Sequence, residues 1–201
     1  MTNQKNQKKM NCKKNDRPEC PCGFKNVSCR TAGNGKKLIE IKHLRSQLLY
    51  DIANIGYVEG DVTEDELLHA KHTIQDICQS GNVDRVTRIM DLVHGRCADI
   101  LNPISADEDE QESEDIDDTL EEFDVYSITL KVESRFKQST AKLICDIIHE
   151  LIVCTVLWEW LGISNPKASE KWGYKQESLW EQLRSIVYRN QGRVRRPLSP
   201  F

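Results

Sequence analysis

The sequence predicts a mainly α-helical protein, a bundle of about five helices with one strand or β-hairpin, an acidic loop and extended termini. Apolar residues recur every three or four positions in most of the chain between residues 37 and 188. Only residues 125–132 alternate apolar and polar side chains with the period of a strand. Strongly charged segments at both ends and in the middle carry too few apolar side chains to join a core.

Residues 37–104 are expected to form the N-terminal helices. The first helix spans 37–55 and stops near Gly56 and Gly60, because glycine favours turns and helix ends. Its apolar residues follow helical spacing and are Leu38, Ile41, Leu44, Leu48, Leu49 and Ile52.

Two more helices follow in this segment. The second is expected to begin at Thr63, where Thr63 and Glu66 fit a capping box that satisfies free backbone N–H groups. The third is capped by Asn82 or Asp84 and ends before Pro103, which disfavours a helical conformation in the preceding residue. Its inward stripe is Val86, Ile89, Met90, Val93, Cys97 and Leu101.

The segment 125–191 combines the strand with the two longest helices. A helix over 140–161, capped by Ser139, is apolar around nearly its whole circumference, so other helices or an oligomer partner must surround it. Pro166 suits the first turn of a last helix over 167–188. Its inward residues are Ala168, Trp172, Leu179, Leu183 and Val187. The strand needs a pairing partner, either in this chain or from a neighbouring subunit.

Three segments are strongly charged. Residues 1–36 form a basic, cysteine-containing leader that is expected to be flexible. Residues 105–124 carry twelve Asp or Glu and no basic residue, which predicts a solvated loop. Residues 192–201 form a basic arm, extended because Gly192 and two prolines exclude a helix. This uneven charge indicates contacts with charged partners.

No segment predicts a secretion signal or a membrane span. The N-terminus lacks the apolar stretch of a signal peptide. Residues 143–163 are long and apolar, but they contain Asp146, Glu150 and Glu159, and each charge costs about 3 kcal/mol near a bilayer centre. We therefore expect a buried helix, no membrane partner, and a location in the cytoplasm.

Four cysteines, Cys12, Cys20, Cys22 and Cys29, are the candidate metal ligands. Thiolates bind Zn²⁺ tetrahedrally, but these residues lack the close C-x-x-C pairs that are typical of structural zinc sites. The alternatives are a zinc site and a disordered leader with incidental thiols, and no other cofactor is expected. The remaining cysteines are expected in the core and are Cys78, Cys97, Cys145 and Cys154.

No histidine pattern predicts catalysis. His69 and His72 share a helix face with an aspartate one turn away, which fits either a metal site or a surface pair. His149-Glu150 lacks the second histidine of H-E-x-x-H, so His149 is expected to be a hydrogen-bonded structural residue. Neither a nucleotide-binding glycine motif nor G-x-S-x-G occurs, and we expect no enzyme activity.

Aromatic and arginine side chains predict protein partners, including further copies of this chain, because these residue types anchor many interfaces. Trp158 and Trp172 are assigned to the core. The strand is expected to pair with an adjacent subunit at its edge. The candidate partner-binding residues are Tyr126, Ile128, Leu130, Trp160, Trp180, Arg193, Arg195, Arg196 and Phe201. No helix has the face of a nucleic-acid reader, so nucleic acid is not expected as a partner.

Stretches of the second half carry a resemblance to known proteins. They are Tyr126-Ser-Ile-Thr-Leu130, Phe136-Lys-Gln-Ser-Thr140, Ile148-His-Glu-Leu151, Leu157-Trp-Glu-Trp-Leu161, Asn165-Pro166, Lys171-Trp172 and the arm from Gly192 to Phe201. Over residues 37–201 the chain resembles uncharacterised proteins from prophages and mobile elements of gut Bacteroidetes. The order of its elements is similar to that of phage head–tail connector adaptors.

This resemblance implies a virion structural protein of the adaptor or head-completion type. Adaptors of this kind are small helical bundles that form rings and reach into neighbouring subunits with a loop and a C-terminal arm. The alternative is a small zinc-binding regulatory or nucleic-acid-binding protein that uses the cysteines of the leader.

Overall fold

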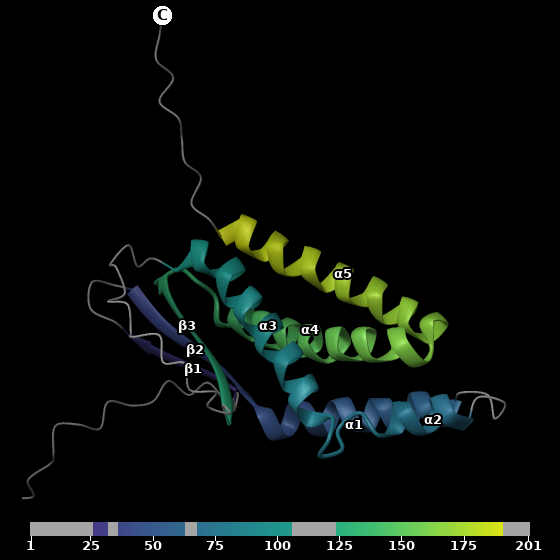
Figure 1. Ribbon diagram of the computed structural model, residues 1–201. Coiled ribbons are helices and arrows are strands. Elements are labelled where there is room, and N and C mark those ends of the chain that lie inside the picture. The colour runs from purple at the N-terminus through teal and green to yellow at the C-terminus, as the bar shows by residue number, and fades with distance from the viewer. Residues whose placement is uncertain (1–25, 32–35, 63–67, 106–123, 191–201) are drawn as a thin grey trace, which may run out of the picture.

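The computed structural model describes residues 26–31, 36–62, 68–105 and 124–190 (Figure 1). They form a three-stranded sheet and five α-helices, which confirms the mainly α prediction. The strands are β1 (Val27–Thr31), β2 (Lys36–Leu44) and β3 (Val125–Glu133). The helices are α1 (Arg45–Val62), α2 (Leu68–Gln75), α3 (Val83–Leu101), the 3₁₀ helix η3 (Asn102–Ile104), α4 (Gln138–Ser164) and α5 (Pro166–Asn190). The predicted capping box at Thr63, most of the acidic segment and the arm 192–201 lie outside the described residues.

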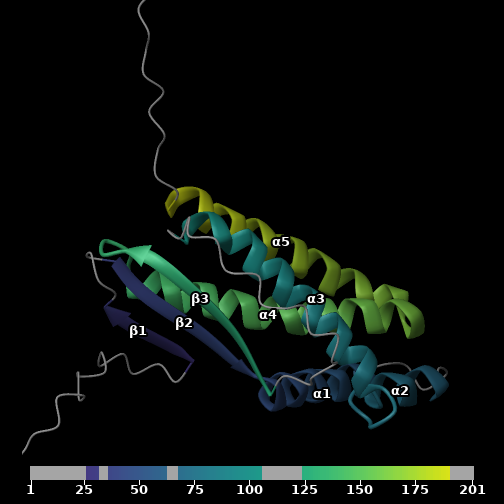
Figure 2. The ribbon, with the colours of Figure 1, turned by 60° about the vertical axis from the view of Figure 1, so that its left-hand side comes forward.

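The sheet is antiparallel, with β2 between β1 and β3 (Figure 2). Ile41 of β2 pairs with Val27 of β1 and with Ile128 of β3, and all three side chains are buried. His43 pairs with Tyr126 on the same face. One face of the sheet therefore belongs to the core, and the strand that β3 needs for pairing comes from this chain.

The prediction of a single helix over 37–55 is wrong for its first part, because residues 36–44 form β2. Leu38, Ile41 and Leu44 have helical spacing. The buried side chains are instead the alternating Ile39, Ile41 and His43. Hydrogen bonds to β1 and β3 on its two edges satisfy the backbone N–H and C=O groups of β2. The alternating side chains then share one buried face of the sheet, which they would not do in a helix. The predicted flexible leader likewise ends too late, because it includes β1.

Two glycines allow α1 and α2 to pack closely. α1 continues past the buried Gly56 and Gly60, contrary to the prediction that they end it. A Cβ atom on Gly56 would lie 3.0 Å from Cγ2 of Ile77 and 3.3 Å from the backbone oxygen of Ile74. One on Gly60 would lie 2.7 Å from Cγ of Gln75. The glycines therefore make room for the neighbouring segment.

We expect Gly56→Leu to lower the free energy of unfolding by about 1–3 kcal/mol, because the new side chain overpacks the α1–α2 contact. The matched control is Gly95→Leu on α3, where an added Cβ meets nothing within 4 Å. This control should instead gain about 0.5–1 kcal/mol from helix propensity. Urea denaturation followed by circular dichroism measures both changes, and equal effects of the two substitutions would contradict the close packing at Gly56.

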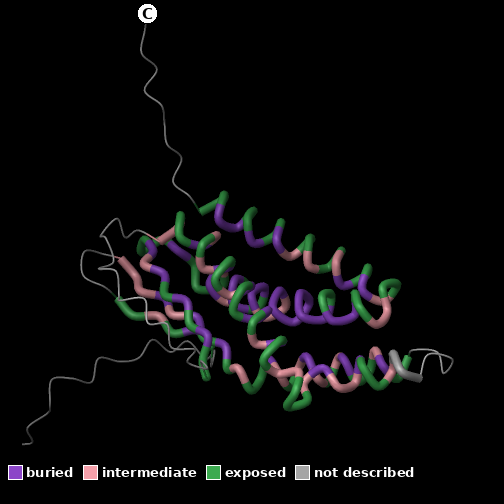
Figure 3. The backbone as a smooth tube through the Cα atoms, viewed as in Figure 1, coloured by how far each residue is buried: buried purple, intermediate pink, exposed green. Residues whose placement is uncertain are grey.

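The remaining helices surround α4, whose side chains are buried along most of its length (Figure 3). All six residues of the predicted α3 stripe are buried, which confirms that prediction. In α5 the prediction is also confirmed, because Trp172, Leu183 and Val187 are buried while Ala168 and Leu179 pack partly buried against the core. α5 begins at Pro166, as expected.

The helix caps differ from the prediction. Asn82 occupies the N-cap position of α3, but its side-chain amide donates to the backbone oxygen of Asp76 at 2.8 Å and does not cap the helix. α4 begins at Gln138, before Ser139, with Lys137 in the cap position and no side-chain cap bond. At the start of α5, Oδ1 of Asn165 accepts a hydrogen bond from the backbone N–H of Ala168 at 3.2 Å.

Candidate protein-binding site

A pocket of about 490 Å³ opens on the surface where α3, α4 and α5 meet, and we name it the α3–α4–α5 pocket. α4 and α5 run side by side along it, joined by the short turn at Asn165 (Figures 1 and 2). Its lining residues are Arg96 of α3, Trp158 of α4, and Glu170, Gly173, Tyr174, Gln176, Glu177, Trp180 and Arg184 of α5. Tryptophan, tyrosine and arginine are the residue types that most often anchor protein interfaces.

Trp158 reaches this pocket because α5 carries a glycine opposite to it. Its side chain is 42% exposed, so its assignment to the core is wrong. A Cβ on Gly173 would lie 3.0 Å from the Trp158 Nε1 atom and 3.1 Å from Cδ1. The Ser169 hydroxyl donates to the backbone oxygen of Trp158 at 3.3 Å and ties the two helices together here. The indole therefore lies against the backbone of α5 with part of its surface in water.

Trp180 lies beneath the guanidinium group of Arg96 in the same pocket. The Arg96 Cζ atom is 4.5 Å from the Trp180 ring centroid, which is a cation–π contact between α3 and α5. The Trp180 ring is buried, and its Nε1 has no hydrogen-bond partner within the described residues. An exposed arginine is thus held in place above a rigid ring, which lowers the entropy that it loses on binding a partner.

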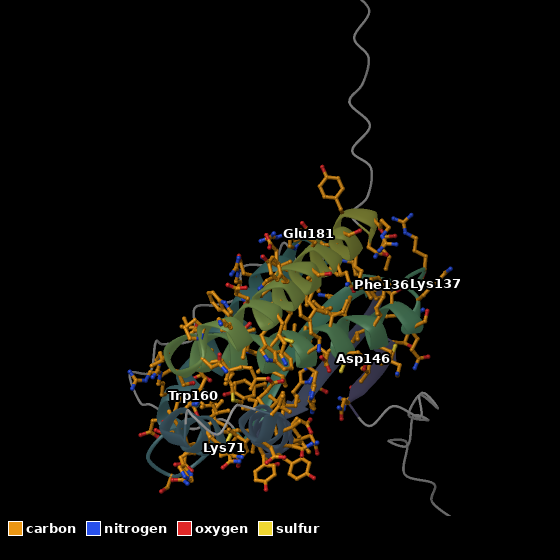
Figure 4. The ribbon with its side chains drawn as sticks, turned by 90° about the vertical axis from the view of Figure 1, so that its right-hand side faces the viewer. Lys71, Phe136, Lys137, Asp146, Trp160 and Glu181 are labelled. Atoms are coloured by element: carbon orange, nitrogen blue, oxygen red, sulfur yellow. The ribbon has the colours of Figure 1, made fainter. Side chains whose placement is uncertain are left out.

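A stripe of carboxylates runs along the exposed face of α5 beside the pocket. Glu170 and Glu177 line the pocket, and Glu181 follows one turn later on the outside of α5 (Figure 4). Tyr174, which is 74% exposed, lies between the first two on the same helix face. None of the three glutamates forms an ion pair with another described residue.

The structure buries all five of the predicted partner-binding side chains that it describes. Tyr126, Ile128 and Leu130 point into the core from β3, and the Tyr126 hydroxyl donates to Oδ1 of Asp91 at 2.7 Å. Trp160 is buried against α2. The prediction that these four residues form surface contacts is wrong, because their side chains pack in the core of the same molecule. Trp180 is buried too, yet it lines the pocket. The other predicted contacts lie outside the described residues and are Arg193, Arg195, Arg196 and Phe201.

The predicted zinc ligands are mostly outside the described part of the chain. Cys12, Cys20 and Cys22 precede it, and Cys29 lies half-buried in β1. Within the described ranges, no group of three or more His, Cys, Asp or Glu side chains is placed to hold a metal ion. The zinc site of the leader stays a prediction. The other four cysteines lie in or against the core, as predicted.

A second group of polar side chains lies between β2, α1 and α4, where His43 and Cys145 are buried and Asp51 and His149 are half-buried. The His43 Nε2 atom lies 4.0 Å from Sγ of Cys145, and the His43 ring centroid is 5.9 Å from that of His149. The His149 Nε2 atom lies 2.9 Å from Oδ2 of Asp51, which links α4 to α1. His149 is therefore the hydrogen-bonded structural residue that the sequence predicts.

The environment of this group keeps His43 and Cys145 uncharged at neutral pH. Burial lowers the pKa of His43 to about 4, and electrostatic interactions with His149 and His94 contribute to lowering it. Burial also raises the pKa of the Cys145 thiol to about 11. A nucleophilic cysteine needs a lowered pKa, so this pair is not arranged for attack on a substrate.

Of the nine residues that line the pocket, the sequence predicted only Trp180 as a contact, and the missed residues include Arg96, Gly173 and Tyr174. One signal for the third is present in the sequence. Tyr174 lies between charged residues on the polar side of the α5 periodicity, where an aromatic side chain must be exposed. The roles of Arg96 and Gly173 depend on how three helices pack and have no local signal.

Within the described residues no helix has the length and apolar character needed to cross a membrane. The chain matches no known family model, no curated protein and no solved structure.

Proposed function

We propose that this chain is a non-catalytic assembly protein that binds other protein subunits, including further copies of itself, through the α3–α4–α5 pocket. The observation that carries the proposal is the exposure of Trp158 and Tyr174 beside the stacked Arg96. Large aromatic groups gain free energy when a partner covers them, and an arginine already held over a ring loses little entropy. Such side chains are typical centres of protein interfaces.

We further propose that the assembly is a phage head–tail connector or head-completion complex. In that function α3, α4 and α5 act as the helical bundle of each subunit. The resemblance of residues 37–201 to prophage proteins supports this, as does the basic C-terminal arm, because connector subunits reach into their neighbours. The protein would act in the cytoplasm of the host cell and in the virion.

The double substitution Trp158→Ala/Tyr174→Ala is expected to weaken self-association by about tenfold or more while the fold persists. Tyr174 is mostly exposed and Trp158 is 42% exposed, so the free energy of unfolding should fall by only about 1 kcal/mol. Sedimentation velocity over a range of protein concentrations measures the association.

Tyr50→Ala/Tyr57→Ala is the matched control, because these tyrosines on α1 are 66% and 60% exposed and do not line the pocket. The control should associate as the unchanged protein does. A protein that stays monomeric at the highest soluble concentration, or an equal loss in both double variants, would contradict the proposed use of the pocket.

A further inference from the structure

We propose that a second pocket, at the end of the molecule where α5 finishes, binds an amphiphilic anion: a carboxylate with a saturated alkyl chain. We name it the end pocket. Its volume is about 910 Å³, within the range of about 300–1,000 Å³ that is typical of small-molecule sites. Its walls come from η3, the end of β3, the first turns of α4 and the last turn of α5 (Figure 1). The inference goes beyond the proposed function and does not depend on it.

Much of the wall of the end pocket is apolar. Val132 of β3 and Ile186 of α5 line it and are buried, so the pocket reaches down to the hydrophobic core. Leu143 of α4 lines it as well but is 47% exposed, which leaves apolar surface in water. An alkyl chain that covers this surface gains about fourfold in affinity for each methylene group that it buries.

Positive charges lie around the same pocket. The turn between β3 and α4 buries Phe136 and leaves its neighbours Arg135 and Lys137 exposed (Figure 4). The backbone N–H of Phe136 donates to the backbone oxygen of Glu133 at 3.0 Å, which fixes this turn. The last turn of α5 adds Arg189. Three cations from two separate segments therefore line the pocket.

Two of these cations have no acidic partner. The Arg135 Nε atom lies 2.6 Å from Oε2 of Glu133, which is the one acidic side chain among the described residues that line the pocket. Lys137 and Arg189 form no ion pair within the described ranges. Nε of Arg189 donates to the backbone oxygen of Ser185 at 3.2 Å, which holds the guanidinium group against α5. The pocket thus carries excess positive charge that an anionic head group neutralises.

The combination favours an alkyl carboxylate over other occupants. A phosphate ion, or an Asp or Glu side chain of a protein partner, neutralises Lys137 and Arg189 but carries too few methylene groups to cover Leu143. An uncharged alkyl molecule covers Leu143 and leaves both cations without a partner. A carboxylate with an alkyl chain satisfies both parts of the pocket. Thr140, which also lines it, supplies a hydroxyl group that can donate to the carboxylate.

Titration calorimetry of the full chain with octanoate, below the concentration at which octanoate forms micelles, tests the inference. We expect saturable binding of about one octanoate per chain. Hexanoate is shorter by two methylene groups and should bind roughly tenfold more weakly. 1-Octanol and octylammonium have the same alkyl chain without the negative charge, and each should bind at least about tenfold more weakly than octanoate.

Reversing the charge of the pocket should exchange its preference. Lys137→Glu/Arg189→Glu should weaken octanoate binding at least about tenfold and strengthen octylammonium binding, a gain that loss of folding cannot produce. Arg88→Glu/Lys167→Glu is the matched control, because it changes the net charge equally at exposed residues that do not line the pocket. The control should bind octanoate within about twofold of the unchanged chain, and circular dichroism measures folding.

The apolar contact has its own variant. Leu143→Gln should weaken octanoate binding by about fivefold or more, because a polar side chain replaces the apolar wall. Leu92→Gln on α3 is the matched control, since Leu92 is 74% exposed and does not line the pocket. It should leave octanoate binding unchanged.

Four results overturn the inference. The first is the absence of saturable octanoate binding by the full chain. Equal affinities for octanoate and hexanoate describe a bare anion site, and equal affinities for octanoate and 1-octanol describe an uncharged cavity. An equal loss in the two charge-reversal variants describes general attraction by the charge of the protein. Self-association is measured separately by sedimentation, so failure of the end pocket and failure of the α3–α4–α5 pocket are distinguished.

Discussion

Trp160→Ala is expected to lower the free energy of unfolding by about 3–5 kcal/mol, the largest effect of any single substitution that we propose. Trp160 is 6% exposed and fills the space between α4 and α2 (Figure 4). Its Nε1 donates to the backbone oxygen of Thr73 at 3.0 Å, and Arg85 lies over its ring. Alanine would leave a cavity and an acceptor without a donor, and both cost free energy.

Two variants separate the contributions to this loss. Trp160→Phe keeps most of the ring volume but cannot donate to Thr73, so it should cost about 1–2 kcal/mol. Trp158→Ala removes the same residue type two positions earlier in α4, where it is 42% exposed, and should cost about 1 kcal/mol or less. Urea denaturation followed by circular dichroism gives all three values. If Trp158→Ala destabilised the protein as much as Trp160→Ala, the placement of the two side chains would be incorrect.

The contrast between α3 and β2 shows which elements could be predicted from the sequence. In α3 the apolar residues recur with the helical period and lie on one face, opposite the polar residues. This periodicity alone predicts all six buried residues. In β2 the apolar residues fit both a helix and a strand. The strand is decided by β1 and β3, and β3 lies some ninety residues away in the chain. Such long-range pairing cannot be read from a local pattern.

The candidate site illustrates a second limit. α4 is apolar around nearly its whole circumference, so the sequence gives no direction in which Trp158 or Trp160 points. Trp160 is buried because α2 packs over it, whereas Trp158 lies beside Gly173 and stays partly exposed. The aromatic content of the last two helices predicts that some of these rings lie at the surface. Which rings are exposed depends on the packing of three helices.

Glycines account for the third difference. The sequence predicts helix ends at Gly56 and Gly60, because glycine is a common helix terminator. In α1 they serve packing instead, since α2 and the turn after it approach the helix where side chains are missing. A glycine in a helix costs about 1 kcal/mol relative to alanine, and the contact with α2 offsets this cost. At these glycines helix propensity thus lowers the stability of the protein, whereas tertiary packing raises it.

The free energy of unfolding is expected to fall by about 3 kcal/mol as the pH falls from about 6.5 to about 4, because His43 is buried without charge. His43 is 2% exposed and uncharged in the fold, and burial is the main cause of its lowered pKa. In the unfolded chain the imidazole takes up a proton near its ordinary pKa of 6.5. The unfolded state therefore binds more protons in this pH range, so stability is full above pH 6.5 and declines toward pH 4.

His43→Leu should remove most of this pH dependence, because leucine fills the site without a titrating group. It also removes the buried His43 Nδ1 atom, which has no hydrogen-bond partner within the described residues. Burial lowers the pKa of His94 as well, so a smaller decline in the same direction should persist.

His72→Leu on the exposed face of α2 is the matched control. Free energies of unfolding from urea titrations between pH 7 and pH 4 measure the slopes. If the free energy of unfolding depended on pH equally in the unchanged protein and in His43→Leu, His43 would be charged or solvated in the fold. That result would contradict its buried position in β2.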